Sequence, residues 1–143
     1  TSYGKSTLNS LKNTENFTDS AIEHIFEGQV NARGKAVGYH YEGIEGTPGN
    51  VIPGTESSVN NIGVYKAQVE VNGIPKTANG GFSTFYSKNL SPQQVVDAIN
   101  EAYSNCELKL GTRNTYQGVA NNGMKIDMFL DQSGKIISAF PEE

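Results

Sequence analysis

Short apolar segments separated by turn-forming residues are the feature that most constrains the fold of this chain. Of its 143 residues, 16 are glycine, and asparagine, serine and threonine are common between the apolar segments. Glycine and asparagine favour turns, so this distribution predicts many short strands and argues against a helical bundle. A chain of this length is expected to form one compact domain with its own core.

Two segments have the sequence of short helices. Residues 17–28 place apolar side chains at helical spacing and end in a glycine that can terminate a helix. Thr18 or Asp19 is expected to cap this first helix. Ser91-Pro92-Gln93-Gln94 combines a serine cap, an early proline and the glutamine of a capping box, and therefore predicts a second helix.

Alternating apolar and polar residues predict the strands. We expect them over residues 35–42, 64–71, 82–86, 124–130 and 135–140. In the first strand, the alternation places Tyr39 on one face and Gly38 and His40 on the other. Asn72-Gly73 is a strong hairpin signal, and residues 43–63 are expected to form a long loop. Because helices and strands are interleaved without a βαβ rhythm, the expected fold class is α+β.

Charge and cysteine content restrict the function classes. The net charge is −4 and the pI is about 5.2, which counts against a protein that binds nucleic acid through a broad basic surface. A local basic patch would still serve an enzyme that contacts RNA only briefly. Cys106 is the single cysteine, so neither an internal disulfide nor a cysteine zinc site is expected. No apolar run approaches the ~18 residues of a membrane-spanning helix, and no membrane association is expected.

The chain contains two histidines, His24 and His40. They do not have the spacing of a metal-binding pair and the carboxylates are scattered, so no metal site is expected. Two imidazoles suit acid–base chemistry because their pKa lies near neutral pH. Cleavage of RNA without a metal needs one group to deprotonate the ribose 2′-hydroxyl and another to protonate the leaving 5′-oxygen. A nearby lysine would stabilise the charge on the phosphoryl oxygens.

Motifs of common hydrolases and nucleotide-binding enzymes do not occur. There is no Gly-x-Ser-x-Gly elbow, and the glycine-rich stretch Gly43–Gly54 lacks the Gly-Lys-Ser/Thr ending of a phosphate-binding loop. A non-catalytic binding module of a secreted effector remains an alternative, because the acidic, turn-rich composition would also fit it.

The sequence around the two histidines resembles the EndoU endoribonucleases. It reads Glu23-His24-Ile25-Phe26-Glu27-Gly28-Gln29 and Gly38-Tyr39-His40, where the family has Glu-His-hydrophobic-Phe-x-Gly-Glu and Gly-Phe/Tyr-His. Lys76, Ser83, the helix start at Ser91 and the ending Ile137–Pro141 then follow in the family's order. The resemblance covers about residues 17–141. It is nearest to the bacterial toxin domains of contact-dependent or LXG-type secreted effectors.

The resemblance implies a role for each catalytic residue. His40 would be the general base at the 2′-hydroxyl, His24 the general acid, and Lys76 the group that stabilises the phosphoryl charge. Lys88, just before the Ser91 helix, is the alternative lysine. No metal or other cofactor is implied for this branch, although some animal and viral relatives depend on manganese.

Further residues are implied to bind the base or to support the site. Ser138 and Phe140 would form the floor of the base pocket, and Glu23 and Ser83 would support the catalytic groups. The sequence departs from the family pattern at Gln29, where the family has glutamate, and at Phe140, where it has tyrosine.

The fold implied is that of the barnase, EndoU, colicin-nuclease and RelE-like group. A helix-bearing N-terminal half (about residues 1–63) and a sheet-plus-helix C-terminal half (about 64–143) would form one domain, 1–143, around a cleft. The implied activity is RNA cleavage to 2′,3′-cyclic phosphate and 5′-hydroxyl ends by a monomeric toxin, with tRNA the expected substrate. Such a toxin would be exported by a bacterial system, would act in the cytoplasm of a target cell, and would be blocked by a cognate immunity protein.

Overall fold

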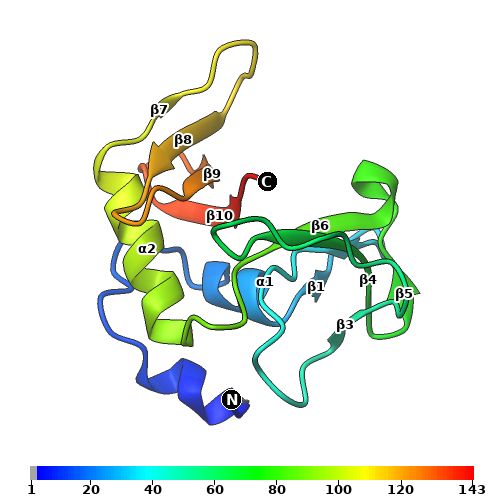
Figure 1. The fold of residues 1–143 in the computed structure, drawn as a ribbon. Coiled ribbons are helices and arrows are strands. Elements are labelled where there is room, and N and C mark those ends of the chain that lie inside the picture. Colours follow the sequence, from blue (N-terminus) through cyan, green and yellow to red (C-terminus); the bar gives the residue numbers. More distant parts are fainter. Residues whose placement is uncertain (1–2) are drawn as a thin grey trace.

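The computed structural model describes residues 3–143 and combines antiparallel sheets with short and long helices (Figure 1). The α-helices are α1 (Ala21–Phe26) and α2 (Pro92–Ser104), and the 3-10 helices are η1 (Lys5–Ser10) and η2 (Ala78–Gly81). The strands are β1 (Gln29–Val30), β2 (Ala36–Val37), β3 (Gly49–Val51), β4 (Tyr65–Val71), β5 (Ile74–Pro75), β6 (Phe82–Phe85), β7 (Glu107–Leu108), β8 (Thr115–Val119), β9 (Lys125–Leu130) and β10 (Ile136–Pro141). This mixture confirms the α+β class.

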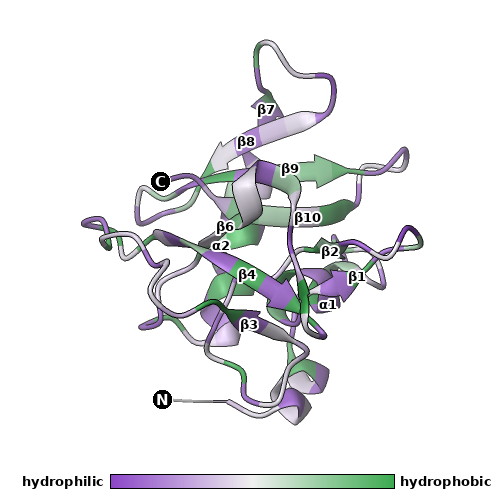
Figure 2. Cartoon of the chain, turned by 90° about the vertical axis from the view of Figure 1, so that its right-hand side faces the viewer, coloured by the Kyte–Doolittle hydropathy of each residue, from purple (hydrophilic) through white to green (hydrophobic). Residues whose placement is uncertain are grey.

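The elements form two packed groups. One sheet has the strand order β10-β9-β8-β7, and α2 packs against its β8 and β9. The other group contains β3, β4 and β5, with β6 paired to β4 and the β1–β2 hairpin beside β4. The helix α1 packs against β10 and so joins the two groups (Figure 1). The main hydrophobic core draws on α1, α2, β9 and β10, and both strands contain long hydrophobic (green) stretches in Figure 2.

Strong local signals in the sequence produced the expected elements. The Ser91 hydroxyl accepts from the Gln94 amide and the Gln94 side chain accepts from the Ser91 amide, which is the predicted capping box. The strand β4 buries every second side chain. Asn72 and Gly73 both have positive φ and connect β4 to β5, as a tight hairpin of this type requires.

The first helix is shorter than the sequence predicts. It begins at Ala21, and its N-cap is Ser20, which makes no side-chain cap. The residues expected in its first turn pair with β10 instead, because Phe17 bridges to Ile136 and the Thr18 amide donates to the Ile136 carbonyl. Tertiary pairing therefore overrides the local helical pattern there. The end at Gly28, with φ of 77°, agrees with the prediction.

The predicted strand over residues 35–42 is wrong beyond Val37. Gly38 and Tyr39 have φ of 80° and 72°, so the extended backbone stops there and the expected alternation of faces is lost. The amides of Tyr39 and His40 donate instead to the carbonyls of residues 24 and 25, at 2.8 and 2.7 Å. These carbonyls belong to the last turn of α1, where no amide of the helix itself is available to donate to them. Both Tyr39 and His40 are buried as a result.

The sequence patterns missed the short strand β1, which follows α1, and three further strands. β3 lies inside the expected loop 43–63 and pairs with β4, while β7 and β8 follow α2. Their residues are mostly polar or half exposed, so they lack the apolar alternation that marks a strand. Within residues 3–143, no helix is both long and apolar enough to cross a lipid bilayer.

Candidate active site

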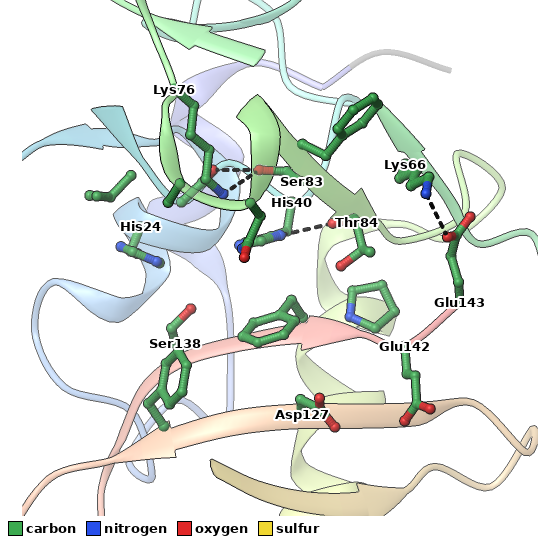
Figure 3. A pocket seen from close by; sticks show the side chains of 18 residues that line it. His24, His40, Lys66, Lys76, Ser83, Thr84, Asp127, Ser138, Glu142 and Glu143 are labelled. Carbon is green, nitrogen blue, oxygen red and sulfur yellow. Dashed lines mark hydrogen bonds and ion pairs between the residues drawn. The ribbon is translucent and has the colours of Figure 1, made fainter. Parts of the chain in front are cut away.

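A cleft of about 600 Å³ lies between β10 on one side and α1 with β6 on the other (Figure 3). It gathers residues that are far apart in the sequence. His24 comes from α1, His40 from the segment after β2, and Lys76 from the segment after β5. The remaining predicted residues in the cleft wall are Ser83 of β6 and Ser138 and Phe140 of β10.

His40 is held in one orientation and one protonation form. Its Nδ1 lies 2.8 Å from the Thr84 carbonyl oxygen. A carbonyl can only accept, so Nδ1 carries the proton in the neutral ring and Nε2 keeps its lone pair. The side chain is 5% exposed. Burial, reinforced by the Lys76 charge, lowers the pKa of His40 to about 3. This imidazole is therefore a proton acceptor at neutral pH.

His24 lies next to His40, with 6.2 Å between the ring centroids. Its Nδ1 is 3.2 Å from Oε1 of Gln29, whose amide nitrogen donates to the Ser20 carbonyl. Because the Gln29 nitrogen is used in that way, its oxygen faces the imidazole and accepts from Nδ1. Burial lowers the pKa of His24, which the Gln29 hydrogen bond partly opposes and the Lys76 charge reinforces.

Gly38 allows the two histidine segments to approach one another. A Cβ at this position would lie 2.3 Å from the His24 carbonyl oxygen and 3.0 Å from its ring. Its φ of 80° is also unfavourable for residues with a side chain. Glycine is thus required here for a close backbone contact with α1, which sets the spacing between His24 and His40.

Lys76 points into the cleft from the end of the β4–β5 hairpin. Its Nζ donates to the Ser83 hydroxyl at 2.9 Å, and that hydroxyl donates to the Gly38 carbonyl at 3.1 Å. Ser83 therefore links the lysine to the histidine segment. Burial lowers the pKa of Lys76. Lys88 lies elsewhere: it lines a separate cavity, pairs with Glu42 at 3.6 Å and sits 5.4 Å from the Tyr65 ring centroid.

Ser138 and Phe140 lie two residues apart on β10, on the wall opposite the lysine. The Phe140 ring stacks on His40 at 5.3 Å and contacts Phe129 at 5.6 Å between centroids. The Ser138 hydroxyl is buried and has no hydrogen-bond partner among the residues that the structure describes. A buried hydroxyl without a partner is unusual and is suited to receiving a polar group of a ligand.

The positions of Glu23 and Asp127 were not predicted from the sequence. Glu23 precedes His24, but its side chain does not line the cleft; its carbonyl accepts the amides of residues 27 and 28. Asp127 of β9 lines the cleft beside Phe140, its register partner on β10, and was not singled out from the sequence. Only its pairing with β10 brings it there, and no local motif signals this. In residues 3–143, no three His, Cys, Asp or Glu side chains are grouped closely enough to hold a metal ion.

The sequence model described as bacterial EndoU nuclease matches residues 18–143. The chain belongs to this family. The EndoU match covers α1 and every later element, including both histidine segments and the β10 strand of the cleft. The resemblance seen around His24 and His40 is therefore confirmed at the level of the family.

A curated relative supports the same family assignment. A protein of Bacillus cereus described as a toxin is 54% identical to this EndoU chain over 136 residues, which are 95% of this chain and 25% of that protein. The chain thus spans about a quarter of the length of that relative. No solved structure matches the chain.

Proposed function

We propose that this EndoU domain is a toxic endoribonuclease that cleaves RNA by transesterification, with a proton acceptor, a proton donor and a cation in one cleft. The observation that carries this proposal is the 6.2 Å separation of the His24 and His40 rings, in the cleft that also holds the Lys76 ammonium. Acid–base cleavage of a phosphodiester requires these three groups on different sides of one phosphate.

The two proton transfers are divided between the two histidines. The bare Nε2 of His40 accepts the proton of the ribose 2′-hydroxyl, and the 2′-oxygen attacks the adjacent phosphorus. The bond from phosphorus to the 5′-oxygen breaks, and protonated His24 donates its proton to that oxygen. The products are a 2′,3′-cyclic phosphate and a 5′-hydroxyl. Lys76 stabilises the charge that builds on the non-bridging oxygens during the transfer.

The test is to incubate the domain with total tRNA and to analyse the ends of the fragments. We expect 2′,3′-cyclic phosphate and 5′-hydroxyl ends, and undiminished cleavage in EDTA, because the two histidines and the lysine supply all the charge and proton transfers that the steps need. Loss of cleavage in EDTA with rescue by manganese would contradict the metal-free mechanism. Intact RNA would favour a non-catalytic binding module instead.

The biological setting is part of the same proposal. The description of the relative from Bacillus cereus as a toxin supports a toxic role. The domain would act as a monomer that is exported by a bacterial system and cleaves RNA, with tRNA the first candidate, in the cytoplasm of a target cell. A cognate immunity protein would then neutralise it by covering His24, His40 or the Ser138–Phe140 segment. A neutralising partner that protects only the opposite face from hydrogen exchange would contradict blocking of the cleft.

Gln29, the hydrogen-bond partner of the His24 side chain, is expected to set the pH dependence of cleavage. Catalysis needs His24 protonated, and burial lowers its pKa from the usual 6.5, so kcat/KM should already fall as the pH rises at values below 6.5. Replacing Gln29 with glutamate places a negative charge at Nδ1 and favours the imidazolium. Gln29→Glu should therefore shift the alkaline limb of the pH–kcat/KM profile upward by about one unit or more. The control variant Gln132→Glu adds the same charge to the exposed β9–β10 turn and should leave the pH profile unchanged. Equal profiles for the native domain and both variants would refute the role of Gln29.

A further inference from the structure

The turn between β1 and β2 carries two cations that no carboxylate neutralises. Arg33 and Lys35 are exposed, and neither forms an ion pair within the range 3–143. The chain has a net charge of −4, so a place where positive charge stands without a neighbouring acid is informative. A polyanion gains free energy where it meets such cations.

The turn is ordered by its own hydrogen bonds. The side-chain oxygen of Asn31 accepts from the amides of Arg33 and Lys35, at 2.9 and 3.0 Å. The Asn31 amide donates to the Lys35 carbonyl at 2.9 Å, and Gly34 takes the positive φ of 76° that closes the turn. Since the backbone is already held, binding a ligand there costs little ordering of the chain.

Both ends of this hairpin lead into the cleft. Gln29, in β1, contacts the His24 ring, and Val37, in β2, lines the cleft wall. Lys35 directly precedes β2 and lies two residues before Val37, so its Cα is at most roughly 7 Å from that of a residue in the cleft wall. Figure 2 shows β1 and β2 beside α1, which carries His24. The two cations thus extend the cleft on its His24 side.

The other end of the cleft has the opposite character. Asp127, Glu142 and Glu143 line it there. Lys109 lies 3.0 Å from Asp127 and 3.8 Å from Glu142, and Lys66 lies 3.7 Å from Glu143. The carboxylates thus outnumber the lysines that neutralise them, and an RNA backbone finds no unpaired cation among these residues. The carboxylates that line the cleft are therefore concentrated at its end away from His24, whereas none of them lies at the His24 end, from which the β1–β2 turn extends.

We propose that Arg33 and Lys35 bind the RNA backbone on the 3′ side of the scissile phosphate. The inference rests on the proposed function, in which His24 protonates the leaving 5′-oxygen. The nucleotide with that oxygen, and every phosphate 3′ to it, must then lie on the His24 side. The β1–β2 turn is the next charged surface in that direction, so the downstream phosphates meet Arg33 and Lys35.

The experiment compares RNA substrates that share one cleavage site and are extended only on its 3′ side or only on its 5′ side. For the native domain, 3′ extension should raise kcat/KM. The variant Arg33→Gln/Lys35→Gln should lose this gain, by about two- to fivefold for each cation at low salt. The slope of log kcat/KM against log salt should also weaken by about 0.7 per cation. Cleavage of the minimal substrate should be unchanged, since neither side chain lines the cleft.

Lys12→Gln is the matched control, because Lys12 is also exposed and without an ion pair within residues 3–143. Lys12 lies beside Gln93 of α2, so this variant should keep the gain in kcat/KM that 3′ extension gives. Full retention of that gain by the double variant would refute the inference and leave the proposed function intact. If the double variant instead lost a gain that came from 5′ extension, the inference would also be refuted, and the RNA would have to run through the cleft in the opposite direction. If the native domain cleaved none of these RNAs, the proposed function itself would fail.

Discussion

Replacement of His24 or His40 by alanine is expected to lower kcat for RNA cleavage by about 10²- to 10⁴-fold, the usual contribution of a general acid or base. The two imidazoles have separate roles. His40 keeps a bare Nε2 because Thr84 occupies its Nδ1, and His24 supplies the proton to the leaving oxygen. The double variant should be little worse than the poorer single variant, because both groups act on one transfer.

Folding must be separated from chemistry in this test, because His40 is buried and stacks on Phe140. Asparagine places an amide nitrogen near the position of Nδ1 and can still donate to the Thr84 carbonyl. His40→Asn should therefore retain the thermal unfolding midpoint better than His40→Ala and be equally inactive. A His40 or His24 variant that is folded and cleaves RNA at nearly the native rate would show that the assigned roles are wrong.

Replacement of Lys76 by alanine is expected to lower kcat by about 10²- to 10³-fold, the effect of removing one preorganised group that stabilises transition-state charge. The lysine lies in the cleft and is held by the Ser83 hydroxyl, so its ammonium needs no reorganisation to meet a phosphate. Ser83→Ala should give a smaller loss, because the charge remains but its anchor is removed.

Lys88→Ala is the matched comparison and should change the rate by only a few-fold, through RNA affinity and with visible salt dependence. Its pairing with Glu42 is exposed, and pairs of this kind contribute little to stability. Both variants are measured on one RNA at two salt concentrations. A large loss in Lys88→Ala with little loss in Lys76→Ala would reverse the choice of lysine.

The sequence singled out the candidate catalytic residues of the cleft but little of their arrangement. The paired motifs identified His24 and His40, and the order of later motifs pointed to Lys76, Ser83, Ser138 and Phe140, all of which the structure places in one cleft. Glu23 is not among the lining residues. The hydrogen bond from His40 to Thr84 was unpredictable, because it joins residues 44 positions apart through a backbone carbonyl that carries no sequence signal.

The secondary structure shows the same division. The helix α2 was predictable because its capping box and apolar stripe lie within the helix itself. The strand pattern at Gly38 to Tyr41 was misleading, because hydrogen bonds to the end of α1 turn this backbone away from the extended form. β8, whose partners are β7 and β9, has no strong alternation of its own and depends on those neighbours.

By itself, the sequence determined the family, the chemical groups available for catalysis and the elements with self-contained signals, since caps, tight turns and alternation act over a few residues. Only the tertiary structure decided which groups meet. It placed Lys76 rather than Lys88 in the cleft with the histidines, fixed the proton of His40 on Nδ1, and left Arg33 and Lys35 without ion pairs on the His24 side. These outcomes depend on contacts between segments distant in the chain, and such contacts are set by packing of the whole core.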